Sequence, residues 1–161
     1  MTEKQYNECV NLYADNVFRF IVKNLNHTED ARDIVQSTFE KLWMNRSKVE
    51  METSKSYLFT IAYHNMIDHI RKNKKADLVD EYNESSKMVH QNFFQVSEIL
   101  HKALEKLNET QKSLVLLKDY EGYSYEEIGK ITGLNESQVK VYLHRARIIL
   151  KNYLVSKENV V

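Results

Sequence analysis

The sequence predicts an all-α protein built from two small helical domains. Its 161 residues include no proline and only 3 glycines. Tight β-hairpin turns favour glycine, so this composition argues against a protein built from hairpins. Apolar residues instead recur every three or four positions over most of the chain, which is the spacing of one helix face. Gly122, Gly129 and Gly133 all follow Glu121. Connections before that point therefore depend on Asn, Asp, Ser and Thr.

The first two helices are predicted from apolar spacing and from start signals. Residues 3–25 carry an apolar stripe at helical spacing and end before the polar stretch at 26–28. The second helix is predicted to begin at Thr28, because two acidic residues follow at its positive end, and to end near Trp43. Its expected inward-facing residues are Ala31, Ile34, Val35, Thr38, Leu42 and part of Trp43.

A third helix is predicted over residues 54–75. A polar loop at 46–53 precedes it, and Ser54 provides a start signal. Apolar residues then return at helical spacing. The end of this helix is basic, since residues 64–75 contain one acidic residue, Asp68, against Arg71, Lys72, Lys74 and Lys75.

An acidic tether is predicted between the two domains. Residues 76–95 are acidic and have few apolar side chains, a composition typical of segments that bury too little surface to fold. The domains are therefore expected at 1–75 and 96–161. The second begins with helices at 96–107 and, after a cap signal, at 113–120. The formal net charge is zero, but it is assembled from separate basic and acidic blocks, which favours two basic patches on either side of the connector.

The C-terminal third predicts a helix-turn-helix. Ser124 and Glu127 have the spacing of a capping box at a helix start, and Gly133 can end that helix in the left-handed conformation. Asn135 and Gln138 repeat the start signal. Two helices joined by a short glycine-containing turn form the unit that places its second helix in the DNA major groove.

The second helix of this unit is predicted to have two different faces. At about 100° per residue, its apolar residues fall on one side and most polar and basic residues on the other. Such a helix suits a phosphate-lined groove, although a solvated basic helix packed on a bundle has the same pattern. The inward side is Val139, Leu143, Ala146 and Leu150; the outward side is Ser137, Val141, His144 and Ile148, flanked by Gln138, Lys140, Arg145 and Lys151.

Composition argues against several classes of protein. The single Cys9 cannot form an internal disulfide, which fits a reducing compartment. The N-terminus lacks the pattern of a signal peptide, and no apolar run approaches membrane-spanning length. A cytoplasmic protein without membrane insertion is expected, or a nuclear one in a eukaryote. The 6 histidines are scattered without metal-ligand spacing, and the paired carboxylates have no matching base or nucleophile. No enzyme, metal, cofactor or small-molecule substrate is therefore expected.

Three segments together resemble the bacterial extracytoplasmic-function (ECF) sigma factors, the small two-domain branch of the sigma-70 family. The first reads DARDIVQSTFEKLW (30–43) and is similar to the region 2 helix that docks on core RNA polymerase. The second reads YLFTIAYHNMIDHIRK (57–72) and resembles the stretch that melts and reads the −10 promoter element. The third, at 104–147, resembles region 4, which reads the −35 element. The resemblance implies a sigma subunit with core RNA polymerase, promoter DNA and an anti-sigma factor as partners.

In the first segment, the resemblance implies a face that docks on the polymerase. Polar residues recur there every three or four positions and form a ridge with an aromatic end, and aromatic residues are common interface anchors. Trp43 and Phe39 could equally complete the domain core. The implied polymerase-binding residues are Asp33, Gln36, Phe39, Glu40 and Trp43.

In the second segment, the resemblance implies capture of the melted −10 strand. Unpaired bases are held by aromatic stacking and by hydrogen bonds to their edges, while cations follow the backbone. The family usually has Arg-Asn where Tyr63 and His64 stand, so His64 and Asn65 are nominated jointly for base capture. Tyrosines at helical spacing are also common core residues. The implied −10 residues are Tyr57, Tyr63, His64, Asn65, Arg71 and Lys72.

In the third segment, the resemblance implies −35 recognition. The usual Arg-Ser-Arg is replaced here by Lys140, Val141 and Tyr142, and lysine lacks the forked donors of arginine, so a different promoter sequence is expected. Arg147 could contact a phosphate or serve as a salt-bridge partner. The implied −35 residues are Ser137, Gln138, Lys140, Val141, His144, Arg145 and Arg147.

Two other functions remain open on sequence grounds. A helix-turn-helix regulator that acts without polymerase docking would need a ligand pocket or a self-complementary apolar face in the N-terminal half. That half instead carries the polar ridge and the aromatic, basic helix. A helical scaffold or anti-sigma-like protein without a DNA role would bind through protein contacts alone and respond little to salt.

Overall fold

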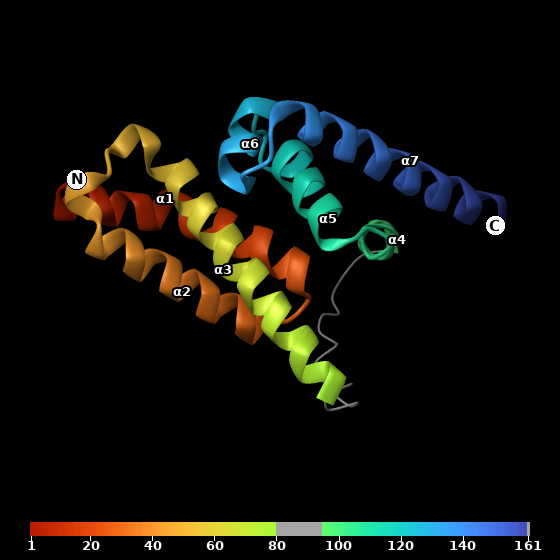
Figure 1. Ribbon diagram of the computed structural model, residues 1–161, viewed down its shortest axis with the longest axis horizontal. Helices are drawn as coiled ribbons and strands as arrows, with labels where there is room; N and C mark the ends of the chain where they lie inside the picture. Colours follow the sequence, from red (N-terminus) through yellow and green to blue (C-terminus); the bar gives the residue numbers. More distant parts are fainter. Residues whose placement is uncertain (80–94, 161) are drawn as a thin grey trace. The chain divides into compact units, whose positions relative to one another are not determined.

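The computed structural model describes residues 1–79 and 95–160, and these are almost entirely helical (Figure 1). Within these residues there is no β-strand, which confirms the all-α prediction. The chain divides into two compact units, Met1–Val89 and His90–Val161. None of the described helices is long and apolar enough to cross a lipid bilayer.

Over residues 1–79, the first unit is built from three long helices, each of which packs against the other two (Figure 1). They are α1 (Glu3–Leu25), α2 (Thr28–Met44) and α3 (Met51–Val79), with a short 3-10 turn, η1 (Arg46–Lys48), between α2 and α3. Phe20 of α1 and Phe59 of α3 lie 5.5 Å apart between ring centroids at the centre of this core. Leu42 of α2 and Met66 of α3 are fully buried with them.

Local polar contacts set where α1 and α2 begin and end. Thr2 and Gln5 form a capping box at the start of α1, and Asn26 ends that helix in the left-handed conformation with φ 57°. α2 begins at Thr28 as predicted, but its cap is the preceding residue, since His27 Nδ1 accepts the Asp30 N–H at 3.2 Å. Histidine is not among the usual capping residues, so this cap could not be predicted from the sequence.

The connection between α2 and α3 is shorter than the predicted loop at 46–53. Its first residues form η1, Val49 is buried, and α3 already begins at Met51 instead of Ser54. The Ser54 hydroxyl is buried within the helix and donates to the Met51 carbonyl at 2.7 Å. What looked like a start signal is therefore a side chain bonded back to its own helix.

The predicted tether begins with helix. α3 continues to Val79, so residues 76–79 are helical, and Gln95 already belongs to the next helix. Acidic residues lower helix propensity only modestly, and no glycine or proline interrupts this stretch. The remainder of the predicted tether, residues 80–94, lies outside the described residues.

The described part of the second unit, residues 95–160, contains four helices and one π-helical turn. They are α4 (Gln95–Leu104), α5 (Glu109–Val115), the turn η3 (Leu116–Tyr120), α6 (Tyr125–Thr132) and α7 (Glu136–Val160). α7, blue in Figure 1, packs against α4, α5 and α6. Asn108 and Gln111 form the capping box at the start of α5. Lys112 is buried at 6% exposure with its ammonium 2.8 Å from Glu105 Oε1, because a buried charge requires a partner.

Candidate functional site

The helix-turn-helix consists of α6 and α7, and reciprocal caps hold both helix starts. The Glu127 N–H donates to Ser124 Oγ at 3.1 Å, and the Ser124 N–H donates to Glu127 Oε1 at 2.9 Å. Asn135 and Gln138 make the same exchange at 2.8 and 3.0 Å. Gly133 ends α6 in the left-handed conformation with φ 84°. All three predicted signals are confirmed.

Gly129 lets the turn lie close against α6. A β-carbon at this position would lie 2.7 Å from the Leu134 carbonyl oxygen, and a backbone atom cannot rotate out of the way. Any other residue would therefore move the turn away from α6 and shift the start of α7. The sequence placed Gly129 near the helix-turn-helix but contained no signal for this contact.

The two faces of α7 lie as predicted. Val139, Leu143 and Ala146 are buried at 1% exposure or less. On the opposite side, Val141 and Ile148 are 44% and 46% exposed. This confirms that α7 packs on its own unit through one stripe and leaves the other face to solvent.

Three of the candidate −35 residues are held by contacts within the unit. The Gln138 side chain belongs to the cap of α7. Lys140 lies 3.6 Å from a Glu136 oxygen and 5.5 Å from the centre of the Tyr125 ring. The Arg147 guanidinium donates to Asp119 Oδ1 at 2.9 Å. Of the two roles predicted for Arg147, the structure therefore shows the salt bridge.

The other four candidates on α7 are exposed and uncommitted. Their side chains form no hydrogen bond or ion pair with any residue that the structure describes. They occupy successive turns of one face, so a ligand lying along that face can meet all of them. These four, called the reading set below, are Ser137, Val141, His144 and Arg145.

Burial divides the candidate −10 residues on α3. Tyr63 is only 8% exposed, so its ring is a core element in this structure, and its role as a base-stacking residue stays a prediction. Periodicity alone could not separate a stacking tyrosine from a packing one. Tyr57 is half-buried, whereas Arg71 and Lys72 are exposed near the end of the described part of α3.

His64 and Asn65, nominated jointly, have different surroundings. His64 is exposed and meets only the edge of the Tyr63 ring, with 5.5 Å between ring centroids. The Asn65 amide is half-buried and donates to Ser37 Oγ at 3.3 Å. His64 is therefore the more accessible side chain of the pair.

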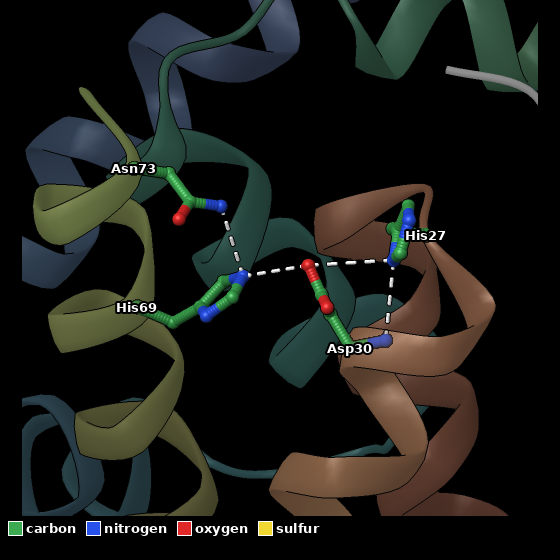
Figure 2. Close-up of polar contacts among 4 residues, drawn as sticks. All are labelled: His27, Asp30, His69 and Asn73. Atoms are coloured by element: carbon green, nitrogen blue, oxygen red, sulfur yellow. Dashed lines mark hydrogen bonds and ion pairs between the residues drawn. The ribbon is translucent and has the colours of Figure 1, made fainter. Parts of the chain in front are cut away.

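A polar cluster that the sequence did not predict joins α2 to α3. Figure 2 shows the Asp30 carboxylate between two imidazole rings, 2.9 Å from His69 Nε2 and 3.3 Å from His27 Nδ1. The Asn73 amide nitrogen lies 3.0 Å from the same His69 nitrogen. The Asp30–His69 contact ties the start of α2 to the half of α3 that ends in the basic candidates.

The outward face of α2 carries the candidate docking residues, with one exception. Asp33, Gln36 and Glu40 are exposed, and the Gln36 amide donates to Glu40 Oε1 at 3.2 Å. Phe39 is only 7% exposed and belongs to the core. Of the two roles left open for Phe39, the structure therefore shows the core role, and its docking role stays a prediction.

Trp43 lies at the end of this face, and two neighbouring side chains contact its ring. It is 36% exposed, the Arg46 guanidinium carbon lies 3.6 Å from the ring centroid, and the Tyr6 ring meets it edge-on at 4.9 Å. The Arg46 Nη1 also donates to the Trp43 carbonyl at 2.8 Å. A fixed, half-exposed aromatic ring is a suitable interface anchor.

Tyr6 is itself fixed by a hydrogen bond to α2. Its hydroxyl donates to the Phe39 carbonyl at 3.0 Å. Burial raises the pKa of this phenol, and the nearby Glu40 carboxylate raises it further. The phenol therefore stays protonated over the neutral range, as its donor role requires.

The sequence matches two family regions in the order found in the fold. Sigma-70 region 2 matches residues 9–76, which cover most of the first unit, and Sigma-70, region 4 matches residues 97–150 in the second. Together they cover more than half of the chain.

Proteins that match this chain over most of their length are also RNA polymerase sigma factors. RNA polymerase sigma factor YlaC of Bacillus subtilis is 30% identical over 157 residues, which cover 91% of this chain and 90% of the relative. ECF RNA polymerase sigma factor SigM of the same organism is 25% identical over 149 residues, with 89% and 91% covered.

A solved structure with the same fold is the sigma factor RpoE of Bartonella quintana in complex with the anti-sigma factor NepR. It is 25% identical, has a TM-score of 0.80, and the match covers 94% of this chain and 97% of that one. The chain therefore belongs to the sigma-70 family as an ECF RNA polymerase sigma factor, a transcription initiation factor that directs the polymerase to promoters.

Proposed function

We propose that the two units divide promoter recognition between them. Residues 1–75 dock on core RNA polymerase and capture the melted −10 strand, residues 96–161 read the −35 duplex, and the acidic segment 76–95 tethers the two. The observation that carries this division is the reading set, four uncommitted side chains on the outward face of a capped recognition helix. A tether lets both units bind at once, so that each raises the effective concentration of the other.

In the −35 interface, the start of α7 faces the base edges and its flanks face phosphates. Arg145 has five free donor positions and can pair with a guanine through two of them. Ser137 and His144 supply shorter polar contacts on either side. Lys140 is held near Glu136 and adds positive charge at the rim.

In the −10 interface, α3 provides a capture site and a cationic track. His64 and Asn65 hold the flipped base, with His64 as the more accessible partner, and Tyr57 forms a neighbouring surface. Arg71 and Lys72 then follow the backbone of the strand. The polar cluster of Figure 2 keeps this half of α3 aligned with α2.

In the polymerase interface, Trp43 is the anchor and the polar residues form the rim. Asp33 and Glu40 supply negative charge, which steers association with a basic surface. The stacked Arg46 lowers the entropy lost when Trp43 is buried.

We further propose an anti-sigma factor as a regulatory partner, because the sigma factor RpoE, which has the same fold, is bound to the anti-sigma factor NepR. The protein acts in the cytoplasm and catalyses no bond-breaking step of its own. It needs no metal, cofactor or small-molecule substrate.

The experiment that tests the division is co-purification with bacterial core RNA polymerase, with run-off transcription from genomic fragments in the same tube. Stable association together with new start sites supports the proposal and yields the promoter. Promoter binding without polymerase association would instead support a helix-turn-helix regulator and would overturn the role of the first unit.

A further inference from the structure

The reading set contains one side chain that cannot form a hydrogen bond. Val141 is 44% exposed on the outward face of α7. Ser137 precedes it by one turn, and His144 and Arg145 follow it by one turn. At about 100° per residue, Val141 lies within the arc that these three polar residues span. The methyl groups of Val141 are therefore directed toward the same ligand surface as Ser137, His144 and Arg145.

The major groove presents one apolar group among its hydrogen-bonding atoms. That group is the C5 methyl of thymine, and apolar side chains contact it there. Cytosine, in the same place, offers a donor and no methyl. An exposed valine between polar readers therefore discriminates thymine from cytosine without any hydrogen bond.

We propose that Val141 is a specificity residue that packs against a thymine methyl group in the −35 element. This inference rests on the proposed function of α7 and deepens it by naming a feature of the bound sequence. It requires that a thymine occur within the −35 element on either strand, next to the position that Arg145 reads. The valine excludes water from that methyl group, and the gain is the burial of two small apolar surfaces.

The neighbouring contacts support access to Val141 from the groove side. Gln138 is drawn into the cap of α7, and Lys140 lies toward Glu136 and Tyr125. Neither long side chain forms its contacts across Val141, since both point to residues at the start of α6 and α7. The valine is therefore left uncovered between shorter or uncommitted side chains.

Ile148 provides a matched control on the same helix. It is 46% exposed, nearly equal to Val141, and lies two turns further along the same face. Base edges are read by the N-terminal part of a recognition helix, so Ile148 is beyond the reading positions. Replacing it removes a similar exposed apolar group without touching the reading set.

The test uses the −35 element that run-off transcription identifies, and it replaces the thymines of that element one at a time. Each thymine is replaced by deoxyuridine, which removes the methyl and keeps every hydrogen-bonding atom, and the affinity of the holoenzyme for the promoter is measured. We expect one position at which the exchange weakens binding about three- to fivefold, the effect of one buried methyl group. Val141→Ala should reduce this ratio, because the smaller side chain covers less of the thymine methyl, whereas Ile148→Ala should keep the full ratio.

Three results would overturn the inference. Uracil exchange could have no effect at any position, the ratio could persist undiminished in Val141→Ala, or Ile148→Ala could abolish it instead. In each of these cases the holoenzyme still binds the −35 duplex, so the proposed function is unaffected. Failure of that function has a different signature, because then neither the thymine nor the uracil promoter is protected at −35.

Discussion

The outward faces of α2 and α7 are both exposed and polar, but their side chains are arranged differently. On α2, three of the candidate docking residues are held by contacts, because Gln36 is bonded to Glu40 and Trp43 is stacked under Arg46, while Asp33 remains uncommitted. On α7, the reading set has no partner among the described residues. A face that meets one fixed protein gains from being ordered in advance. A face that reads bases must keep its donors available, because each internal bond would have to be broken first.

The largest difference between the two faces is expected when Trp43, the proposed anchor on α2, is removed. Trp43→Ala should weaken binding to core polymerase by about 2–4 kcal/mol, the effect of truncating an interface hot spot. Binding of the −35 duplex by the isolated chain should not change. Titration of labelled core polymerase measures the first quantity, and a Trp43→Phe variant controls for lost packing against Tyr6. Equal losses in both assays would break the comparison.

The complementary change removes the main donor of the reading set. Arg145→Ala should weaken promoter binding by about 1–3 kcal/mol, the range for one bidentate base contact, and leave polymerase affinity unchanged. Promoter affinity and start-site use measure this effect. A variant that lost polymerase binding to the same extent would show that α7 is not a separate reader.

A smaller effect is expected at the rim of the docking face. Asp33 is exposed and uncommitted, so Asp33→Ala should slow association with the polymerase and reduce its salt dependence. Gln36→Ala should act in the same direction and be weaker, since it carries no charge. Stopped-flow association at several salt concentrations measures both. An unchanged association rate for Asp33→Ala would place the docking surface elsewhere.

The smallest effect is expected for Arg147→Ala, which tests whether Arg147 has a structural role and not a base-reading one. Its guanidinium is bonded to Asp119, and both side chains are nearly half exposed, at 44% and 45%. Arg147→Ala should lower the free energy of unfolding of the second unit by about 0.2–1 kcal/mol without changing which base sequence is preferred. Thermal unfolding and promoter selection measure these two quantities. A changed sequence preference would return Arg147 to the base-reading residues.

What the sequence predicted well was local. Capping residues and the glycine that ends α6 lie within a few positions of the groups they contact, so the pairs at Ser124 and Asn135 were correct to the residue. The outward and inward faces of α7 also follow from spacing within one helix. Such features need no knowledge of how distant segments pack.

What the sequence could not predict depends on contacts between helices. Phe39 and Tyr63 are buried because other helices cover them, and periodicity does not reveal how wide the covered stripe is. His69 meets Asp30 from 39 positions away in the sequence. The sequence left two roles open for Arg147, because its salt-bridge partner Asp119 lies 28 positions away. Each of these features therefore concerns a residue whose surroundings come from elsewhere in the chain.

The reciprocal caps of the second unit also determine how it folds. Between Asn108 and Gln138, three helix starts are each specified by two residues three positions apart. Short helices such as α6 are marginal alone, but a cap limits the starting points that the chain has to search. Units dominated by such local contacts fold within microseconds to milliseconds. The DNA-reading unit therefore needs no template to find its helix boundaries, and it can reform them quickly after any local unfolding.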